Sequence, residues 1–219
     1  MDTTSKNVSA EVSWVDRINK RFHETGRIIP ERQEKLYQKI RDEFVAGRTC
    51  LDVGCSCGVG SNILSHFSRY TWGVDVNAEA IDYATKMFKR PNLDFEVLDI
   101  ENPPTRELAK FELITMIEVL EHLENPEQAI QNLKRFFQPE TMGFITIPNQ
   151  NNEQVRINEA KHGFHLHKFT AGEFYELMTK HFNSVTMYSV DKLDGWGMES
   201  TCDGNSNDYL IVAKVEQAK

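Results

Sequence analysis

The sequence is poor in cysteine, with four among 219 residues. Cys50, Cys55 and Cys57 lie close together and cannot join distant parts of the chain. Few, clustered thiols are typical of proteins in a reducing compartment. The spacing Cys55-x-Cys57, without a second pair, does not match a zinc knuckle. The sequence therefore predicts no disulfide framework, and we interpret the two loop cysteines as small residues in a tight turn.

Long apolar runs and excess positive charge are also lacking. No stretch approaches the roughly 20 apolar residues of a membrane span, and residues 1–12 lack the apolar segment of a signal peptide. The net charge of -8 disfavours general attraction to phosphate backbones. We therefore expect a cytoplasmic protein without a membrane segment. Its expected partner is a small molecule, with nucleic acid as the less favoured alternative.

Strand-like apolar runs alternate with helical patterns through most of the chain, which predicts a doubly wound, mostly parallel α/β sheet. The last two of seven strands are joined by 191–207 without a helix, so the last strand is expected to be antiparallel. The expected strands are 49–55, 71–77, 93–100, 111–119, 142–148, 184–190 and 208–215, and the expected helices are 31–44, 61–68, 78–88, 126–137 and 171–182.

Two helical patterns precede the first strand and are separated by Gly26 and Pro30. Proline and glycine interrupt helices, so the first pattern ends near them and the second begins at about Glu31. These observations predict two parts. Residues 1–44 form an N-terminal helical extension or lid, and residues 45–219 form the main domain.

A glycine-rich segment, DVGCSCGVG, follows the first strand and precedes a helix. Glycine adopts positive φ and lets a ligand approach the backbone closely. Open α/β sheets bind ligands at the carboxyl ends of their strands. The spacing G-x-x-x-G-x-G differs from the dinucleotide motif, and no lysine with Ser or Thr follows the last glycine, which argues against a P-loop. The segment predicts a ligand-binding loop.

Two further acids mark the ends of the next two strands. Asp75 ends the second strand, where a carboxylate can accept hydrogen bonds from both ribose hydroxyls. Asp99 ends the third strand and is followed by Ile100, a pair that suits the edge and face of an adenine. Either acid alone has a structural reading, such as an acid at a helix N-terminus. Three acids at successive strand ends predict a nucleoside-containing cofactor.

With these motifs the chain resembles the class I S-adenosylmethionine-dependent methyltransferases over about residues 45–215. The resemblance implies a Rossmann-like fold of seven strands with the last antiparallel, and S-adenosylmethionine as cofactor. It implies that the glycine-rich loop holds the amino-acid part of the cofactor, and that the later acids hold its nucleoside. The implied cofactor residues are Asp52, Gly54, Cys55, Ser56, Gly58, Gly60, Asp75, Val76, Asp99, Ile100 and Ile117.

The fourth strand runs into Glu118, Glu121 and His122, and the segment 161–167 adds three histidines, among them His165. Three readings stay open. His122 or one of the later histidines, such as His165, is a general base near neutral pH, with Glu118 beside it. Alternatively Glu118, Glu121, His122 and His165 hold Mg²⁺ or Mn²⁺. In the third reading Glu118 orders the cofactor side, while Glu121 and His122 cap the next helix.

The acidic-histidine turn also carries a resemblance. Its EVLEH sequence is similar to the turn of ubiquinone-pathway O-methyltransferases and of many sugar and small-molecule methyltransferases. It also matches the E-x-x-E-H of small-RNA terminal 2′-O-methyltransferases, which hold a metal with two glutamates and two histidines. Because histidines suit deprotonation of an oxygen, we expect O-methylation of a small hydroxylated metabolite or sugar. The alternatives are an RNA-terminal 2′-O-methyltransferase and a non-catalytic S-adenosylmethionine-binding regulatory subunit.

Overall fold

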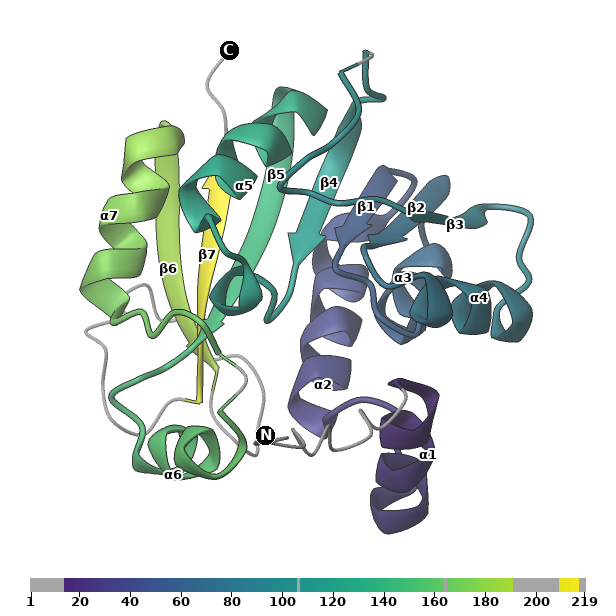
Figure 1. Cartoon of the computed structure of the whole chain (residues 1–219). Coiled ribbons are helices and arrows are strands. Elements are labelled where there is room, and N and C mark those ends of the chain that lie inside the picture. Colours follow the sequence, from purple (N-terminus) through teal and green to yellow (C-terminus); the bar gives the residue numbers. More distant parts are fainter. Residues whose placement is uncertain (1–13, 106, 164, 191–208, 217–219) are drawn as a thin grey trace, which may run out of the picture.

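A computed structural model describes residues 14–105, 107–163, 165–190 and 209–216 (Figure 1). The helices are α1 (Trp14–Thr25), α2 (Glu31–Ile40), α3 (Val59–Ser65), α4 (Ala78–Met87), α5 (Pro126–Leu133), α6 (Glu153–His162) and α7 (Ala171–His181), with short turns η1 (Arg41–Val45), η2 (Leu120–His122) and η3 (Lys134–Phe136). The strands are β1 (Thr49–Val53), β2 (Tyr70–Asp75), β3 (Leu93–Val97), β4 (Phe111–Met116), β5 (Phe137–Pro148), β6 (Ser184–Val190) and β7 (Leu210–Glu216).

The seven strands form one sheet in the order β3-β2-β1-β4-β5-β7-β6. β1 to β5 pair in parallel, and β7 is antiparallel to both of its neighbours, β5 and β6. The predicted fold, a mostly parallel seven-stranded sheet with an antiparallel last strand, is confirmed. The order reverses between β1 and β4, and crevices at such reversals bind ligands in open α/β sheets.

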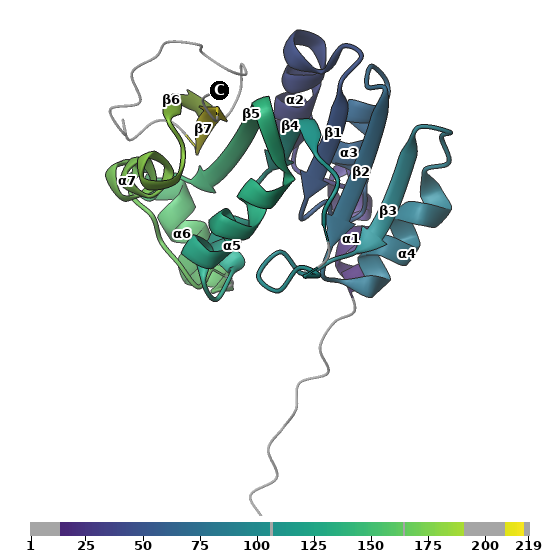
Figure 2. The ribbon, with the colours of Figure 1, turned by 90° about the horizontal axis from the view of Figure 1, so that it is seen from above.

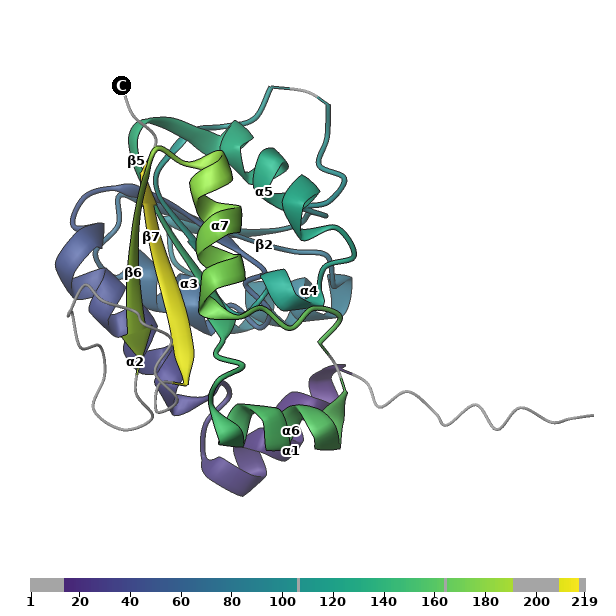
Figure 3. The same ribbon diagram turned by 90° about the vertical axis from the view of Figure 1, so that its left-hand side faces the viewer.

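Helices cover both faces of this sheet, and successive strand residues point to opposite faces. Leu113 of β4 packs in the apolar layer under α2 and α3, and its neighbour Ile114 packs in the layer under α5 and α7. Figure 2 shows the two layers from above, and Figure 3 views them from the β6 edge. Strands buried on both faces read as continuous apolar runs, which is why the sequence identified them.

Several boundaries differ from the sequence prediction. β1, β2, β3 and β4 end earlier than expected, because the residues after them turn into the loops at the carboxyl edge. α5 ends at Leu133 rather than 137, and β5 begins at Phe137 rather than 142. The start of β5 is irregular, since its register with β4 shifts and Glu140 has a φ of +72°. The Cys50, Cys55 and Cys57 thiols are free, and Cys202 lies outside the described residues.

One helix, α6, was not expected from the sequence. The side chain of Asn152 caps it by accepting hydrogen bonds from the amides of Gln154 and Val155, and it ends at Gly163, whose φ is +60°. Cap and stop are both visible in the sequence, but the helix lacks the apolar stripe that marked the others. In Figure 1, α1 and α6 lie beyond the carboxyl edge of the parallel strands. No helix in the described ranges is long and apolar enough to cross a membrane.

Candidate functional site

The loop after β1 takes a left-handed backbone conformation at three residues. The φ angles of Gly54, Ser56 and Gly58 are +70°, +50° and +79°. A Cβ on Gly54 would lie 2.3 Å from Cγ2 of Val119, so glycine is required there for packing as well as for φ. The loop therefore follows a fixed path across the carboxyl edge of the sheet, with Ser56 and Cys57 facing a cleft.

Asp52 lies behind this loop and not in the cleft. Its side chain is fully buried and accepts hydrogen bonds from the hydroxyls of Tyr37, Ser61 and Thr115 at 2.9, 2.7 and 2.7 Å. Burial raises the pKa of this carboxyl, although the three donors oppose the shift. Its oxygens are enclosed by protein hydroxyls, so Asp52, expected from the sequence to hold the cofactor, lies behind the loop in this structure. It holds the loop to α2, α3 and β4.

Gly60 is enclosed in the same way. A Cβ on this residue would lie 2.2 Å from Cζ of Tyr37 and within 2.6 Å of two neighbouring ring carbons. The ring cannot simply rotate away, because its hydroxyl is hydrogen-bonded to Asp52. Gly60, also expected to hold the cofactor, is required here for the packing of α3 against α2.

Replacement of Gly60 by alanine is expected to lower the free energy of unfolding by about 1–3 kcal/mol, as overpacked cores do. Gly172, near the start of α7, has nothing within 4 Å of its added Cβ. Gly172→Ala is therefore the matched control and should be neutral or stabilise by up to about 1 kcal/mol. Chemical denaturation of both variants measures the difference. Equal stabilities would contradict the packing role of Gly60.

Asp75 lies at the carboxyl end of β2, beside the loop. Its two carboxylate oxygens accept hydrogen bonds from the amides of Ser56, at 2.9 Å, and Asn77, at 2.8 Å. Asn77, and not Asp75, caps α4. Val76 is 67% exposed, which is unusual for an apolar residue between a strand and a helix. Asp75 and Val76 thus present a carboxylate and an apolar surface next to the loop, as a nucleoside requires.

The remaining cofactor candidates are less open. Asp99 follows β3 and accepts hydrogen bonds from the Glu101 amide, at 2.8 Å, and the Asn102 side chain, at 2.9 Å. Ile100 and Ile117 are each only 5% exposed and pack in the apolar layers of the sheet. These two side chains belong to the apolar core next to the carboxyl ends of the strands. Cys55 is also buried, and burial raises the pKa of its thiol well above the usual range.

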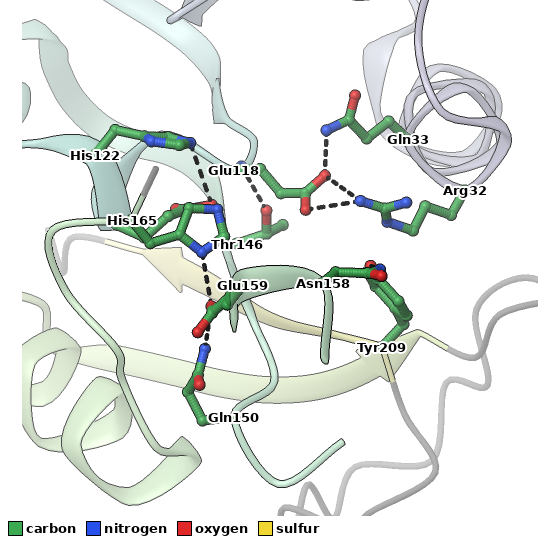
Figure 4. Close-up of polar contacts among 11 residues, drawn as sticks. Arg32, Gln33, Glu118, His122, Thr146, Gln150, Asn158, Glu159, His165 and Tyr209 are labelled. Atoms are coloured by element: carbon green, nitrogen blue, oxygen red, sulfur yellow. Dashed lines mark hydrogen bonds and ion pairs between the residues drawn. The ribbon is translucent and has the colours of Figure 1, made fainter. Parts of the chain in front are cut away.

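Glu118 follows β4 in a left-handed conformation, with a φ of +52°. Its amide donates to Oγ1 of Thr146 at 2.8 Å, which fixes this backbone on β5. Its carboxylate pairs with the Arg32 guanidinium at 3.0 Å and accepts a hydrogen bond from the Gln33 amide (Figure 4). Positive φ at a non-glycine residue is costly and persists where its surroundings hold it. Two side chains of α2 therefore bind the Glu118 carboxylate and hold it in place.

Glu121, His122 and His165 form a separate cluster. One side-chain ligand atom from each residue lies within 4.8 Å of the others, and the two imidazole rings meet edge to face with centroids 4.8 Å apart. Glu121 is 1% exposed, and neither of its carboxylate oxygens has a hydrogen-bond partner among the described residues. Burial raises the pKa of this carboxyl well above its usual range. An unpartnered buried carboxyl is costly, so it calls for an explanation.

The structure thus brings together three of the four metal ligands expected from the sequence. Glu118 lies outside the cluster because Arg32 and Gln33 bind its carboxylate. The reading in which Glu121 caps the next helix is wrong, since its side chain is buried and Asn125 caps α5. His167, another candidate histidine, stacks on Phe169. The side chain of His162 lies outside the described residues.

The cluster and the loop line one cleft of about 520 Å³, bounded by Ser56 and Cys57 on one side and by Glu118, Glu121, His122 and His165 on the other. Residues of α1 and α2 and of the turn between them complete its wall. A second cavity of about 330 Å³ adjoins it through Arg32, Glu118 and His165 and reaches α6 and Tyr209. The cleft is large enough for a small ligand.

A family model described as a methyltransferase domain matches residues 25–187. The chain belongs to this methyltransferase family. Among curated relatives, ubiquinone biosynthesis O-methyltransferase of Coxiella burnetii is 31% identical over 126 residues, which cover 57% of this chain and 52% of that protein. The chain therefore matches about half the length of this relative. The match confirms the class of protein that the glycine-rich loop and the two later acids predicted.

Solved structures similar to this methyltransferase domain share its fold. One is the methyltransferase partner in a Haloferax volcanii complex with the Trm112 methyltransferase activator, at a TM-score of 0.70 and 15% identity, covering 93% of this chain and 96% of that one. Another is the N-methyltransferase NodS of Bradyrhizobium japonicum with S-adenosyl-L-homocysteine, at 0.59 and 18%, covering 85% and 86%. At these identities the similarity concerns the fold alone and does not indicate the methyl acceptor.

Sequence reasoning missed the residues of the site that come from helices. Arg32, Gln33 and Tyr37 belong to α2, where no motif in the sequence marks them as site residues. Glu159 belongs to the unexpected α6 and pairs with His165 at 2.7 Å. A signal existed for α6, namely Asn152 followed by an acidic first turn and a glycine stop. None existed for the α2 contacts, which depend on tertiary packing.

Proposed function

We propose that this methyltransferase domain transfers the methyl group of S-adenosylmethionine to an oxygen of a small hydroxylated acceptor, with a divalent ion held by Glu121, His122 and His165. The observation that carries the proposal is the buried carboxyl of Glu121, which accepts no hydrogen bond from the described residues and meets two imidazoles in the cleft that the loop also lines. Family membership supports the cofactor. The carboxyl and two imidazoles of the cluster support an oxygen acceptor, because a hydroxyl must lose its proton as it is methylated.

On the cofactor side, the loop and Asp75 would bind S-adenosylmethionine. Asp75 already receives two amide hydrogen bonds that set its position, so its carboxylate is oriented for a ribose before any ligand binds. The exposed side chain of Val76 offers an apolar surface for adenine. Ser56 and Cys57 border the cleft where the reacting sulfonium would lie. Asp52 and Gly60 contribute by fixing the loop from behind.

The residues present suit a divalent ion. One carboxylate and two imidazoles are common ligands of Mn²⁺, Fe²⁺ and Zn²⁺, with oxygen ligands from solvent or acceptor completing the set. Ligands around an ion with bonds of about 2.1 Å stand about 3–4 Å apart, so atoms within 4.8 Å need only small side-chain rotations. An ion would also bind the carboxylate oxygens of Glu121, which accept no hydrogen bond from the described residues.

The chemistry of methyl transfer is an in-line displacement, in which the carbon–sulfur bond breaks as a carbon–oxygen bond forms and the acceptor hydroxyl loses its proton. S-adenosylmethionine supplies the electrophilic methyl group, and a divalent ion supplies charge that lowers the pKa of an acceptor hydroxyl. The chain contributes orientation and exclusion of water. His122, which is 44% exposed in its side chain, lies where a proton can pass to solvent.

An acceptor screen tests this proposal directly. The protein is incubated with methyl-labelled S-adenosylmethionine and separate pools of metabolites, saccharides and RNA, with Mn²⁺ or with excess chelator. We expect label in small hydroxylated molecules, and at least a tenfold loss of incorporation in chelator. Label on RNA instead would show that the acceptor is RNA and not a small molecule. Full incorporation in chelator would show that the reaction needs no divalent ion. Absence of any incorporation, together with capture of a partner methyltransferase, would support the regulatory-subunit alternative.

A further inference from the structure

A buried acid on α6 lies directly behind the cluster. Glu159 has 6% of its side chain exposed, and its Oε1 lies 2.7 Å from Nδ1 of His165. The same oxygen accepts a hydrogen bond from the Gln150 side-chain amide at 2.5 Å. Lys168 places its ammonium 3.7 Å from Oε2. Figure 4 shows His165 between Glu159 on one side and His122 on the other.

We propose that Glu159 is a positioning residue, which fixes His165 in the tautomer with the proton on Nδ1 and so presents the Nε2 lone pair to Glu121 and His122. What Nε2 then does rests on the proposed function, but the tautomer itself does not. Glu159 was not assigned to the site from the sequence. It lines the smaller cavity beside His165 and is not among the residues that line the cleft.

The direction of the hydrogen bond follows from the surroundings of Glu159. A buried carboxylate is stable when donors surround it, and here Gln150, His165 and the charge of Lys168 do so. An ionised carboxylate can only accept hydrogen bonds, so Nδ1 of His165 must donate. A neutral imidazole that donates from Nδ1 carries its lone pair on Nε2.

Backbone hydrogen bonds next to His165 also fix the position of its imidazole ring. The carbonyl oxygen of Glu121 accepts hydrogen bonds from the amides of Leu166 and His167, at 2.9 and 3.0 Å. The chain just after His165 is thus tied to the turn that carries Glu121 and His122. Side chain and backbone together leave the imidazole little rotational freedom, and preorganised groups lose less entropy when they act.

The hydrogen bond from His165 to Glu159 matters whether His165 binds a metal ion or acts as a general base. A carboxylate behind an imidazole orients the ring and raises the basicity of its far nitrogen, and loss of such a partner typically costs about 10–100-fold in metal affinity. A purely structural alternative is that the pair only anchors α6 to the segment after it. Both readings use the same hydrogen bond, so they differ in the cation affinity of Nε2, which loss of a mere anchor would not lower.

The decisive measurement is the tautomer of His165 in metal-free protein labelled with ¹⁵N-histidine, read from long-range ¹H–¹⁵N correlations and assigned with His165→Ala. We expect a protonated Nδ1 and an unprotonated Nε2 in the wild type and in Glu159→Gln, whose amide oxygen can still accept. In Glu159→Ala we expect the proton to move largely to Nε2. Glu153→Ala, an exposed acid in the first turn of the same helix, is the matched control and should leave the spectrum unchanged.

Titration with Mn²⁺ provides the second readout. We expect about 10–100-fold weaker binding by Glu159→Ala and a smaller loss by Glu159→Gln, which keeps the hydrogen bond without the charge. A wild-type His165 protonated on Nε2, or a Glu159→Ala variant that keeps the wild-type tautomer, overturns the inference. Should the alanine variant not fold, the wild-type and Glu159→Gln spectra still decide. A wild type with the expected tautomer and no affinity for Mn²⁺ refutes the ion in the proposed function and leaves the role of Glu159 intact.

Discussion

Replacement of Asp75 by alanine is expected to weaken S-adenosylmethionine binding by about 100-fold or more. Hydrogen bonds to a charged acceptor contribute about 1.5–3 kcal/mol each, and the proposed ribose contacts number two. The substitution also releases the amides of Ser56 and Asn77 that the carboxylate now holds. The loss therefore combines missing ligand contacts with a less ordered loop. Calorimetry with S-adenosylmethionine and its demethylated product measures the effect.

A matched control removes an equal charge from the same sheet. Asp94 lies near the start of β3, is exposed, and accepts a hydrogen bond from Tyr70 at 3.0 Å. Asp94→Ala should keep wild-type affinity, because the amino ends of the strands face away from the cleft. Thermal unfolding of both variants separates affinity from folding. A folded Asp75→Ala protein with unchanged affinity would remove Asp75 from the cofactor site.

Replacement of Glu121 by methionine is expected to abolish Mn²⁺ binding and, at the same time, to make the metal-free protein more stable. The buried carboxyl has no hydrogen-bond partner among the described residues, so it contributes an uncompensated cost of desolvation. Replacing buried charged groups by apolar side chains of similar volume often stabilises proteins by about 1–4 kcal/mol. Denaturation in chelator gives the stability, and calorimetry gives the affinity.

The same turn supplies the control for this experiment. Glu124 is exposed, three residues further on, and its substitution by methionine should change neither stability nor Mn²⁺ binding appreciably. A Glu121→Met protein that is clearly less stable than the wild type in chelator would show that this carboxyl has a structural partner. Undiminished Mn²⁺ affinity would show that the cluster does not hold the ion.

The parts of the fold predicted best from the sequence are those set by local pattern. Buried parallel strands read as apolar runs, and a missing crossover helix between the last two strands indicated the antiparallel β7. The strand ends were placed too late, because their apolar residues continue into the loops, as Ile100 and Ile117 do. α6 was missed because its exposed surface has no apolar periodicity.

The sequence predicted the candidate site only where residue type and spacing themselves indicate a chemical role. Glu121, His122 and His165 were identified by type and spacing, and the structure brings them together. Asp52 and Gly60 carry a family motif, yet their surroundings enclose them, and a motif does not report burial. Arg32 binds Glu118 across 86 positions, which no local pattern encodes. Glu159 lies only six positions from His165, but it belongs to the helix that was not expected from the sequence. Ligand-facing residues and those that support them differ only in the folded chain.

Helix α2 touches both halves of the cleft within two turns. Arg32 and Gln33 hold Glu118 on the acceptor side, and Tyr37 holds Asp52 behind the cofactor loop. A helix moves as a rod over such a length, so a displacement at one end is felt at the other. Where binding at one site changes affinity at another, the change is reciprocal. Under the proposed function, α2 is therefore the element to test for coupling between the donor and acceptor sites.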